Sequence, residues 1–109
     1  MPSPSDPLDL RPVRARADER GDDGLLSIRV PRFEGWLARL LGPRLRRPDF
    51  LLRLDAVGTA VWEMCDGART GHQIAAALAS RFPDLAKAEG RTRAFLGLLI
   101  RQGHVRPVR

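Results

Sequence analysis

Capping residues divide the second half of the chain into three helical segments, and this division most constrains how the chain can fold. Asp55 is a good N-cap for a helix over about 56–65. Thr70 and Gln73 have the spacing of a capping box, which predicts the start of a second helix. A third helix is expected over roughly 86–102. The residues expected to face the core are Val57, Val61, Met64 and Cys65 in the first helix (with Trp62 on a flank), Ile74, Leu78 and Phe82 in the second, and Phe95, Leu98 and Leu99 in the third.

Alternating apolar and polar residues predict strands before the helices. Residues 24–30 and 50–54 each place apolar side chains on one face, and Leu51 stands on the otherwise polar face of the second run. Between them, residues 33–41 have the spacing of a short amphipathic helix, which fits core packing or a membrane surface. Residues 104–108 add a short terminal strand. The predicted fold is a small α+β domain, winged-helix-like, with a short antiparallel N-terminal β-sheet followed by three helices.

Charge and proline content set the first 23 residues apart. They contain six acidic and four basic residues, a net charge of −2, whereas residues 24–109 carry 15 basic and seven acidic residues, a net charge of +8. The first segment also holds four prolines and almost no apolar periodicity. Residues 1–23 are therefore expected to form a disordered tail, and residues 24–109 the folded domain.

Few residues of this chain are suited to catalysis. The sequence has two His, one Cys and no Tyr, and Cys65, His72 and His104 lack the spacing of a zinc site. Cys65 lies on the inner stripe of its helix, which favours a buried thiol over a nucleophile. We therefore expect a binding protein that is not an enzyme and holds no metal or cofactor. The chain lacks the apolar run of a signal peptide or membrane span, which predicts a cytoplasmic protein without membrane contact.

The run that begins at residue 54 resembles the PqqD family. It reads Leu54-Asp55-Ala56-Val57-Gly58-Thr59-Ala60-Val61-Trp62-Glu63-Met64-Cys65-Asp66-Gly67-Ala68-Arg69-Thr70. Family members carry a similar Leu-x-x-x-Gly, a Trp or Leu, an Asp-Gly, and a Thr before the second helix. The likeness continues through Ile74-Ala75, Leu78, Arg81-Phe82-Pro83, Phe95-Leu96, Leu99 and Gly103-His104-Val105, and covers about residues 50–106. The Val30-Pro31-Arg32 and Trp36-Leu37 segments resemble a longer PqqD-like subgroup with an extra helix between the first strands.

The resemblance implies a peptide chaperone of winged-helix-like fold, also called a RiPP recognition element. Such a protein holds the leader segment of a ribosomally made precursor peptide and presents it to a modifying enzyme, in the founding pathway a radical S-adenosylmethionine (radical SAM) enzyme. The leader adds as an extra strand beside the domain's third strand, against the third helix. The resemblance implies neither catalysis nor a cofactor. It leaves open whether the product is pyrroloquinoline quinone or another peptide-derived compound, and whether the chain forms a homodimer.

The third predicted helix carries more apolar residues than one core face needs. Leu96 and Ile100 lie well round the helix from the expected core face, so they either pack beneath the strands or line a groove. Arg93, Gly97 and Arg101 form a basic ridge with a gap in its middle. In the groove interpretation the arginines suit an acidic leader peptide, and the glycine lets its backbone come close. The candidate peptide-binding residues are Leu51, Arg53, Arg93, Leu96, Gly97, Ile100 and Arg101.

A winged-helix DNA-binding transcriptional regulator is the alternative that stays open. The net charge of the domain and the arginines of the third helix support it. However, residues 95–100 include no Asn, Gln or Ser to read base edges, so the sequence favours a peptide over nucleic acid.

Overall fold

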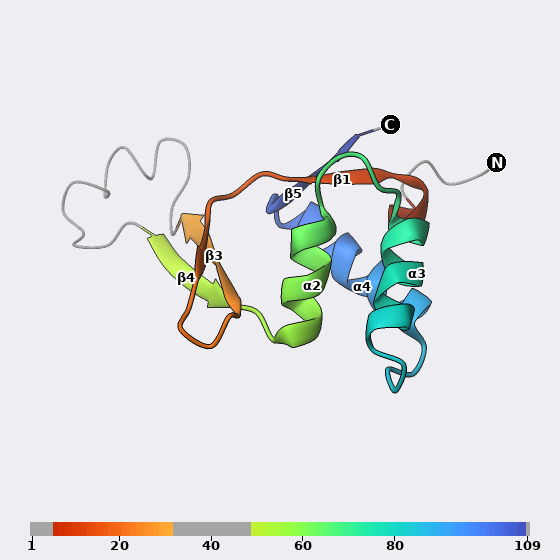
Figure 1. Ribbon diagram of the computed structural model, residues 1–109. Helices are drawn as coiled ribbons and strands as arrows, with labels where there is room; N and C mark the ends of the chain where they lie inside the picture. The colour runs from red at the N-terminus through yellow and green to blue at the C-terminus, as the bar shows by residue number, and fades with distance from the viewer. Residues whose placement is uncertain (1–5, 32–48, 109) are drawn as a thin grey trace.

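The computed structural model describes residues 6–31 and 49–108, and within these ranges short strands precede three helices (Figure 1). In chain order the elements are the 3-10 turn η1 (Pro7–Asp9), the strands β1 (Arg11–Arg14), β2 (Asp18–Arg20), β3 (Leu26–Pro31) and β4 (Asp49–Arg53), the helices α2 (Ala56–Met64), α3 (Gly71–Arg81) and α4 (Ala88–Arg101), and the strand β5 (Val105–Val108). This arrangement confirms the predicted α+β class. The likeness to a winged helix stays a prediction, and the helix expected over residues 33–41 lies outside the described residues. None of the helices in the described ranges is both long and apolar enough to cross a membrane.

The strands form two small antiparallel sheets. In one sheet β3 lies in the middle, with β2 on one side and β4 on the other. Ile28 and Leu52 stand opposite each other across β3 and β4, so the apolar faces of the two predicted strands coincide. The second sheet pairs β1 with β5, which joins the first and last strands of the described chain.

Local capping signals set where the first two helices begin. The Asp55 carboxylate accepts a hydrogen bond from the backbone N–H of Gly58 at the start of α2 (2.7 Å). At the start of α3 the capping box is complete, because Gln73 N–H donates to Thr70 Oγ1 (3.2 Å) and Thr70 N–H donates to Gln73 Oε1 (2.8 Å). α4 instead follows Lys87, whose backbone is left-handed (φ 54°) and whose side chain makes no cap. All three predicted helices are thus confirmed.

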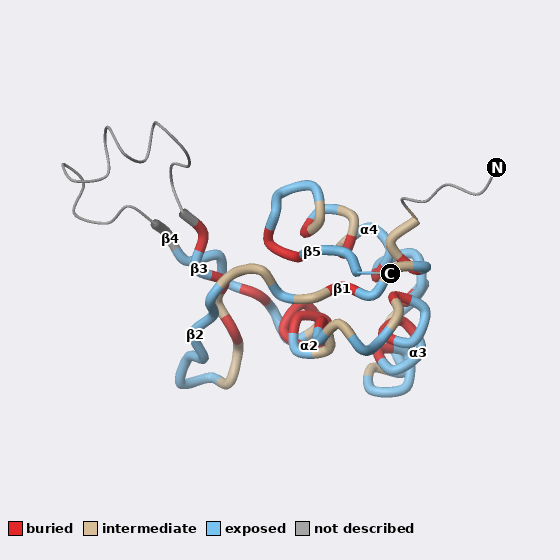
Figure 2. Tube along the Cα trace, turned by 90° about the horizontal axis from the view of Figure 1, so that it is seen from above, coloured by how far each residue is buried: buried red, intermediate tan, exposed pale blue. Residues whose placement is uncertain are grey.

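The core lies between β3 and the helices, and Figure 2 shows buried segments in β3, α2 and α3. Its largest fully buried side chains include Leu8, Ile28, Val61, Trp62, Ile74, Leu78, Leu96, Leu99 and Val105. Trp62 belongs to this set although the sequence places it on a flank of its helix. Its indole N–H donates to Asp18 Oδ2 (2.7 Å), so β2 covers this flank and buries the ring.

The buried face of α4 differs from the predicted one. The buried residues of this helix are Ala88, Thr92, Leu96 and Leu99. Leu98, expected in the core, is 42% exposed, and Phe95 is only partly buried. The prediction followed the largest side chains, but the Thr92 hydroxyl donates to the Ala88 carbonyl (2.7 Å), which allows a polar residue to face the core. Phe95 and Leu98 consequently lie on an outer side of the helix.

The disorder expected of residues 1–23 does not hold for residues 6–23, which pack against the helices; residues 1–5 lie outside the described ranges. Leu8 is fully buried, and η1 packs against both α3 and α4. The backbone N–H of Gly71 donates to Leu10 O (3.0 Å). A single buried leucine and backbone hydrogen bonds order a segment that has no apolar periodicity, which is why composition pointed to a tail.

Gly71→Ala is expected to lower the free energy of unfolding by about 1–3 kcal/mol, since overpacking against a backbone has a cost of this order. A Cβ at residue 71 would lie 2.5 Å from Leu8 Cα and 2.6 Å from Pro7 O. Chemical denaturation of the full chain measures the change. Gly90→Ala is the control, because its Cβ would meet nothing within 4 Å and alanine favours a helix. Equal stability of the two variants would contradict the docking of η1 on α3.

Candidate functional site

β4 is an edge strand in the described part of the chain, because β3 is the only described strand that pairs with it. The N–H of Leu54, just after β4, donates to Leu26 O (2.9 Å) and so points toward β3. Backbone groups alternate in direction along a strand, so the N–H and C=O groups of Leu51 and Arg53 point to the opposite edge. Within the described ranges these groups are open to an added strand.

Two large apolar side chains of β4 are exposed. Among the described residues the exposed large apolar side chains are Leu51 (48%), Leu52 (36%), Leu98 (42%) and Val108 (43%). Leu51 and Leu52 belong to β4, Leu98 to α4 and Val108 to β5. Because successive side chains of a strand point to opposite faces, Leu51 and Leu52 expose apolar surface on both faces of this edge strand.

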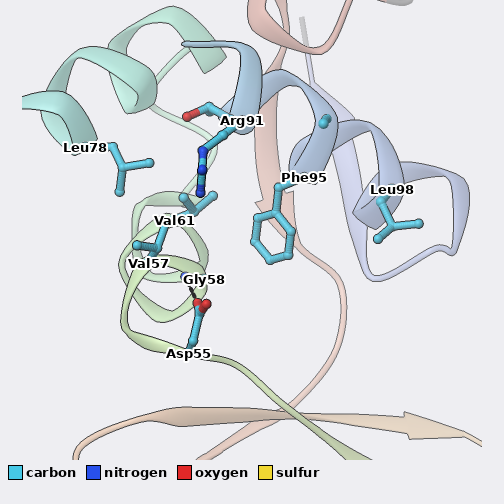
Figure 3. Close-up of a pocket in the computed structure, with 10 residues that line it drawn as sticks. Asp55, Val57, Gly58, Val61, Leu78, Arg91, Phe95 and Leu98 are labelled. Atoms are coloured by element: carbon cyan, nitrogen blue, oxygen red, sulfur yellow. Dashed lines mark hydrogen bonds between the residues drawn. The ribbon is translucent and has the colours of Figure 1, made fainter. Parts of the chain in front are cut away.

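A cavity of about 420 Å³ lies between α2 and α4, beside the point where β4 leads into α2 (Figure 3). Val57, Gly58 and Val61 of α2 line one side, and Phe95 and Leu98 of α4 line the other. Because Gly58 has no side chain, the ring of Phe95 comes close to α2: a Cβ at residue 58 would lie 3.5 Å from Phe95 Cζ. The cavity is mainly apolar and has room for a large side chain of a ligand.

Two charged residues complete the lining of this cavity. Asp55 stands at the start of α2, where its carboxylate is bonded to the N–H of Gly58. Arg91 reaches in from α4 toward Val61, on the opposite side of the cavity from Asp55 (Figure 3). The cavity thus has an apolar middle with an acidic and a basic group at separate places on its rim.

The predicted site residues of β4, Leu51 and Arg53, project from the sheet face that points away from the helices. There they line a second hollow of about 550 Å³ together with the β2–β3 turn. The Arg53 guanidinium pairs with Asp23 of that turn (2.7 Å). The two residues therefore offer their backbone, rather than their side chains, to the open edge of β4.

The expectation that Leu96 lines a surface groove is wrong. Leu96 is fully buried, and Ile100 is partly buried against the core, so core packing describes both residues. The orientation of α4 explains this, because it turns Leu96 inward, leaves Leu98 exposed and buries Phe95 only in part. These two residues and Arg91 were not among the predicted site residues. The signal for them is the spacing of Ala88, Thr92, Leu96 and Leu99, which also fits one helix face and would have placed them on another.

The chain's own N-terminal segment covers the basic ridge of α4. Arg93 Nε lies 3.4 Å from Asp6 Oδ1. A Cβ on Gly97 would lie 3.6 Å from Pro7 Cγ, so Pro7 stands at the gap in the ridge. Arg101 is exposed at its end. The acidic side chain that contacts this ridge within the described residues is thus the chain's own Asp6, and binding of a peptide there stays a prediction.

Asp6 is held as a charged group in this contact. Its carboxylate accepts a hydrogen bond from the backbone N–H of Leu8 (3.0 Å). This bond, and then the neighbouring Arg93, lower the pKa of Asp6 from its ordinary value. The carboxylate is therefore ionised at neutral pH and complements the arginine.

The described residues include Cys65, His72 and His104, whose side chains are the best suited to reactive chemistry. No cluster of His, Cys, Asp and Glu that could hold a metal ion occurs among them. Cys65 is buried, and this burial raises the pKa of its thiol to about 12. The exposed His72 lies with its Nε2 3.0 Å from Asp9 Oδ1, in contact with η1. What the geometry offers is an edge and a cavity for binding.

A family model described as "Coenzyme PQQ synthesis protein D (PqqD)" matches residues 46–105, more than half of the chain. The matched range contains β4 and all three helices, and so both the open edge and the walls of the cavity. No curated protein and no solved structure matches the chain.

Cys65 is expected to resist iodoacetamide at mildly alkaline pH in the folded chain, because a thiol with a pKa of about 12 is protonated there. Mass spectrometry of the chain with and without denaturant measures the labelling. The unfolded chain should be alkylated at the rate of free cysteine. Equally fast labelling of the folded chain would contradict the burial of this side chain.

Proposed function

Because the chain belongs to the PqqD family, we propose that it is a peptide chaperone that binds the leader segment of a ribosomally made precursor peptide. It presents this peptide to a modifying enzyme, such as a radical SAM enzyme, for the synthesis of pyrroloquinoline quinone or another peptide-derived compound. The observation that carries the proposal is the open edge of β4 beside the apolar cavity between α2 and α4. We place this function in the cytoplasm.

Strand addition to β4 is the proposed binding mode. The outward N–H and C=O groups of Leu51 and Arg53 bond the main chain of the peptide, which needs no particular peptide sequence. An added strand also covers an edge that would otherwise be open to unwanted pairing. This explains how a domain of this size can hold an extended segment without a deep cleft.

Side-chain contacts supply the sequence preference in this proposal. Leu52 shares the helix-facing side of β4 with the buried Leu54, yet it is 36% exposed. With Phe95 and Leu98 of α4 it offers apolar surface to the side chains of a bound peptide. Burying these side chains stabilises the complex through the hydrophobic effect.

The DNA-binding alternative gains no support from α4. Its Arg93 is engaged by Asp6 and by Glu89 (3.5 Å), which reduces the charge available to a phosphate. The outer side of the helix carries Phe95 and Leu98, which offer no hydrogen bonds to base edges. We therefore do not propose a second function.

Leu51→Pro is expected to weaken peptide binding about tenfold, because it removes an outward N–H donor that strand addition uses. The probe is a fluorescein-labelled peptide selected on the wild-type chain from a display library of random peptides, and fluorescence anisotropy measures its Kd. Leu51→Thr retains the N–H, suits a strand, and should bind within about threefold of the wild type. Both variants keep the inward bonds to β3, which circular dichroism checks. A Leu51→Pro chain that binds as tightly as Leu51→Thr would contradict strand addition at this edge.

Leu98→Asp is expected to weaken binding of the same peptide about tenfold, because it places a charge on the apolar wall of the cavity between α2 and α4. Val108→Asp is the control, since Val108 is exposed to the same degree (43% against 42%) but lies on β5. Neither change should unfold the chain, because both side chains are exposed. If the two variants lose the same affinity, the peptide does not bind at the cavity between α2 and α4.

A further inference from the structure

Arg91 differs from Arg93, its neighbour two residues along α4. Arg93 is neutralised within the chain by Asp6 and Glu89. Arg91 is exposed, lines the cavity, and makes no ion pair with any of the described residues. A guanidinium that faces an apolar cavity without a partner is suited to pair with an acidic group of a ligand.

Asp55 places a negative charge on the side of the cavity opposite Arg91 (Figure 3). Its carboxylate is held by the N–H of Gly58 (2.7 Å) at the N-terminus of α2, where a negative charge is favoured. A second carboxylate placed beside it would be repelled, whereas one placed beside Arg91 would be attracted. Figure 3 shows the two groups separated by the apolar side chains of Val57, Val61 and Phe95.

We infer that this cavity selects peptides in which a large apolar side chain is flanked by an acidic residue, the apolar side chain entering between α2 and α4 and the carboxylate pairing with Arg91. The inference rests on the proposed function, because the peptide must first lie along β4. A volume of about 420 Å³ suits an inserted side chain rather than a folded element. The guanidinium of Arg91, which pairs with none of the described residues, gives the site a preference that main-chain pairing cannot provide.

Selection from a display library of random peptides tests the inference without knowledge of the natural peptide. The full chain is immobilised as wild type, Arg91→Glu and Arg106→Glu, and enriched peptides are sequenced. Wild type and Arg106→Glu should enrich Asp or Glu next to Leu, Ile, Phe or Trp. Arg91→Glu should retain the apolar preference and enrich Lys or Arg at the acidic position. Arg106→Glu is the control because it makes the same charge change at an exposed position on β5.

A charge swap with one enriched peptide gives the quantitative form of the test. Arg91→Glu should raise the Kd of the acidic peptide about tenfold, and replacing the peptide's acid by Lys should restore binding to that variant. Arg106→Glu should change the Kd by less than about twofold. Peptides that bind through β4 but show no acidic preference, or an unchanged preference with Arg91→Glu, would overturn the inference and leave the chaperone function standing. Failure of the wild type to enrich any peptide would contradict both.

Discussion

The burial of one face of α4 decides where the other parts of the candidate site lie. Leu96 and Leu99 are fully or almost fully buried, and Thr92 joins them because its hydroxyl bonds the carbonyl of Ala88. A helix that buries this face turns Phe95 outward toward α2, where the absence of a side chain at Gly58 makes room for the ring. Had the larger side chains faced the core, the cavity between α2 and α4 would be filled. The hydrogen bond from Thr92 to Ala88 and the missing side chain of Gly58 thus leave room for the cavity between α2 and α4.

The N-terminal segment acts on the opposite side of the same helix. Leu8 is buried against α3, while Asp6 and Pro7 stand beside Arg93 and Gly97. The segment therefore contributes to the core and also contacts the basic ridge of α4 at Arg93 and Gly97. Arg93 is thus engaged within the chain, whereas Arg91 at the cavity pairs with none of the described residues. Arg93 therefore helps to hold the N-terminal segment, while Arg91 stays available to a ligand.

Features that depend on neighbouring residues in the sequence were predictable, and features that depend on packing partners were not. The Asp55 cap, the Thr70–Gln73 box and the alternation of β3 and β4 are local, so the starts of α2 and α3 and the strands β3 and β4 are predicted correctly, whereas β1 and β2 are not. The orientation of α4 depends on which of two apolar faces finds partners, and both faces carry large side chains. The spacing of Ala88, Thr92, Leu96 and Leu99 fits one of these faces but does not by itself select it, and the sequence has no local sign of the burial of Leu8 among prolines and charges. Within the candidate site, the edge strand β4 could be predicted from the sequence. The side chains that α4 turns toward the cavity could be identified only from its packing.

The two parts of the proposed site supply different components of recognition. Main-chain bonds along an open edge hold any extended segment, so on their own they give affinity without selection. The cavity adds selection, because an apolar side chain and a carboxylate must both be placed correctly to use Phe95 and Arg91. The thiol of Cys65 is buried and protonated, and it lies outside the set of residues that line the cavity. In the proposed binding mode the domain holds one segment of the peptide and leaves the rest to a separate modifying enzyme.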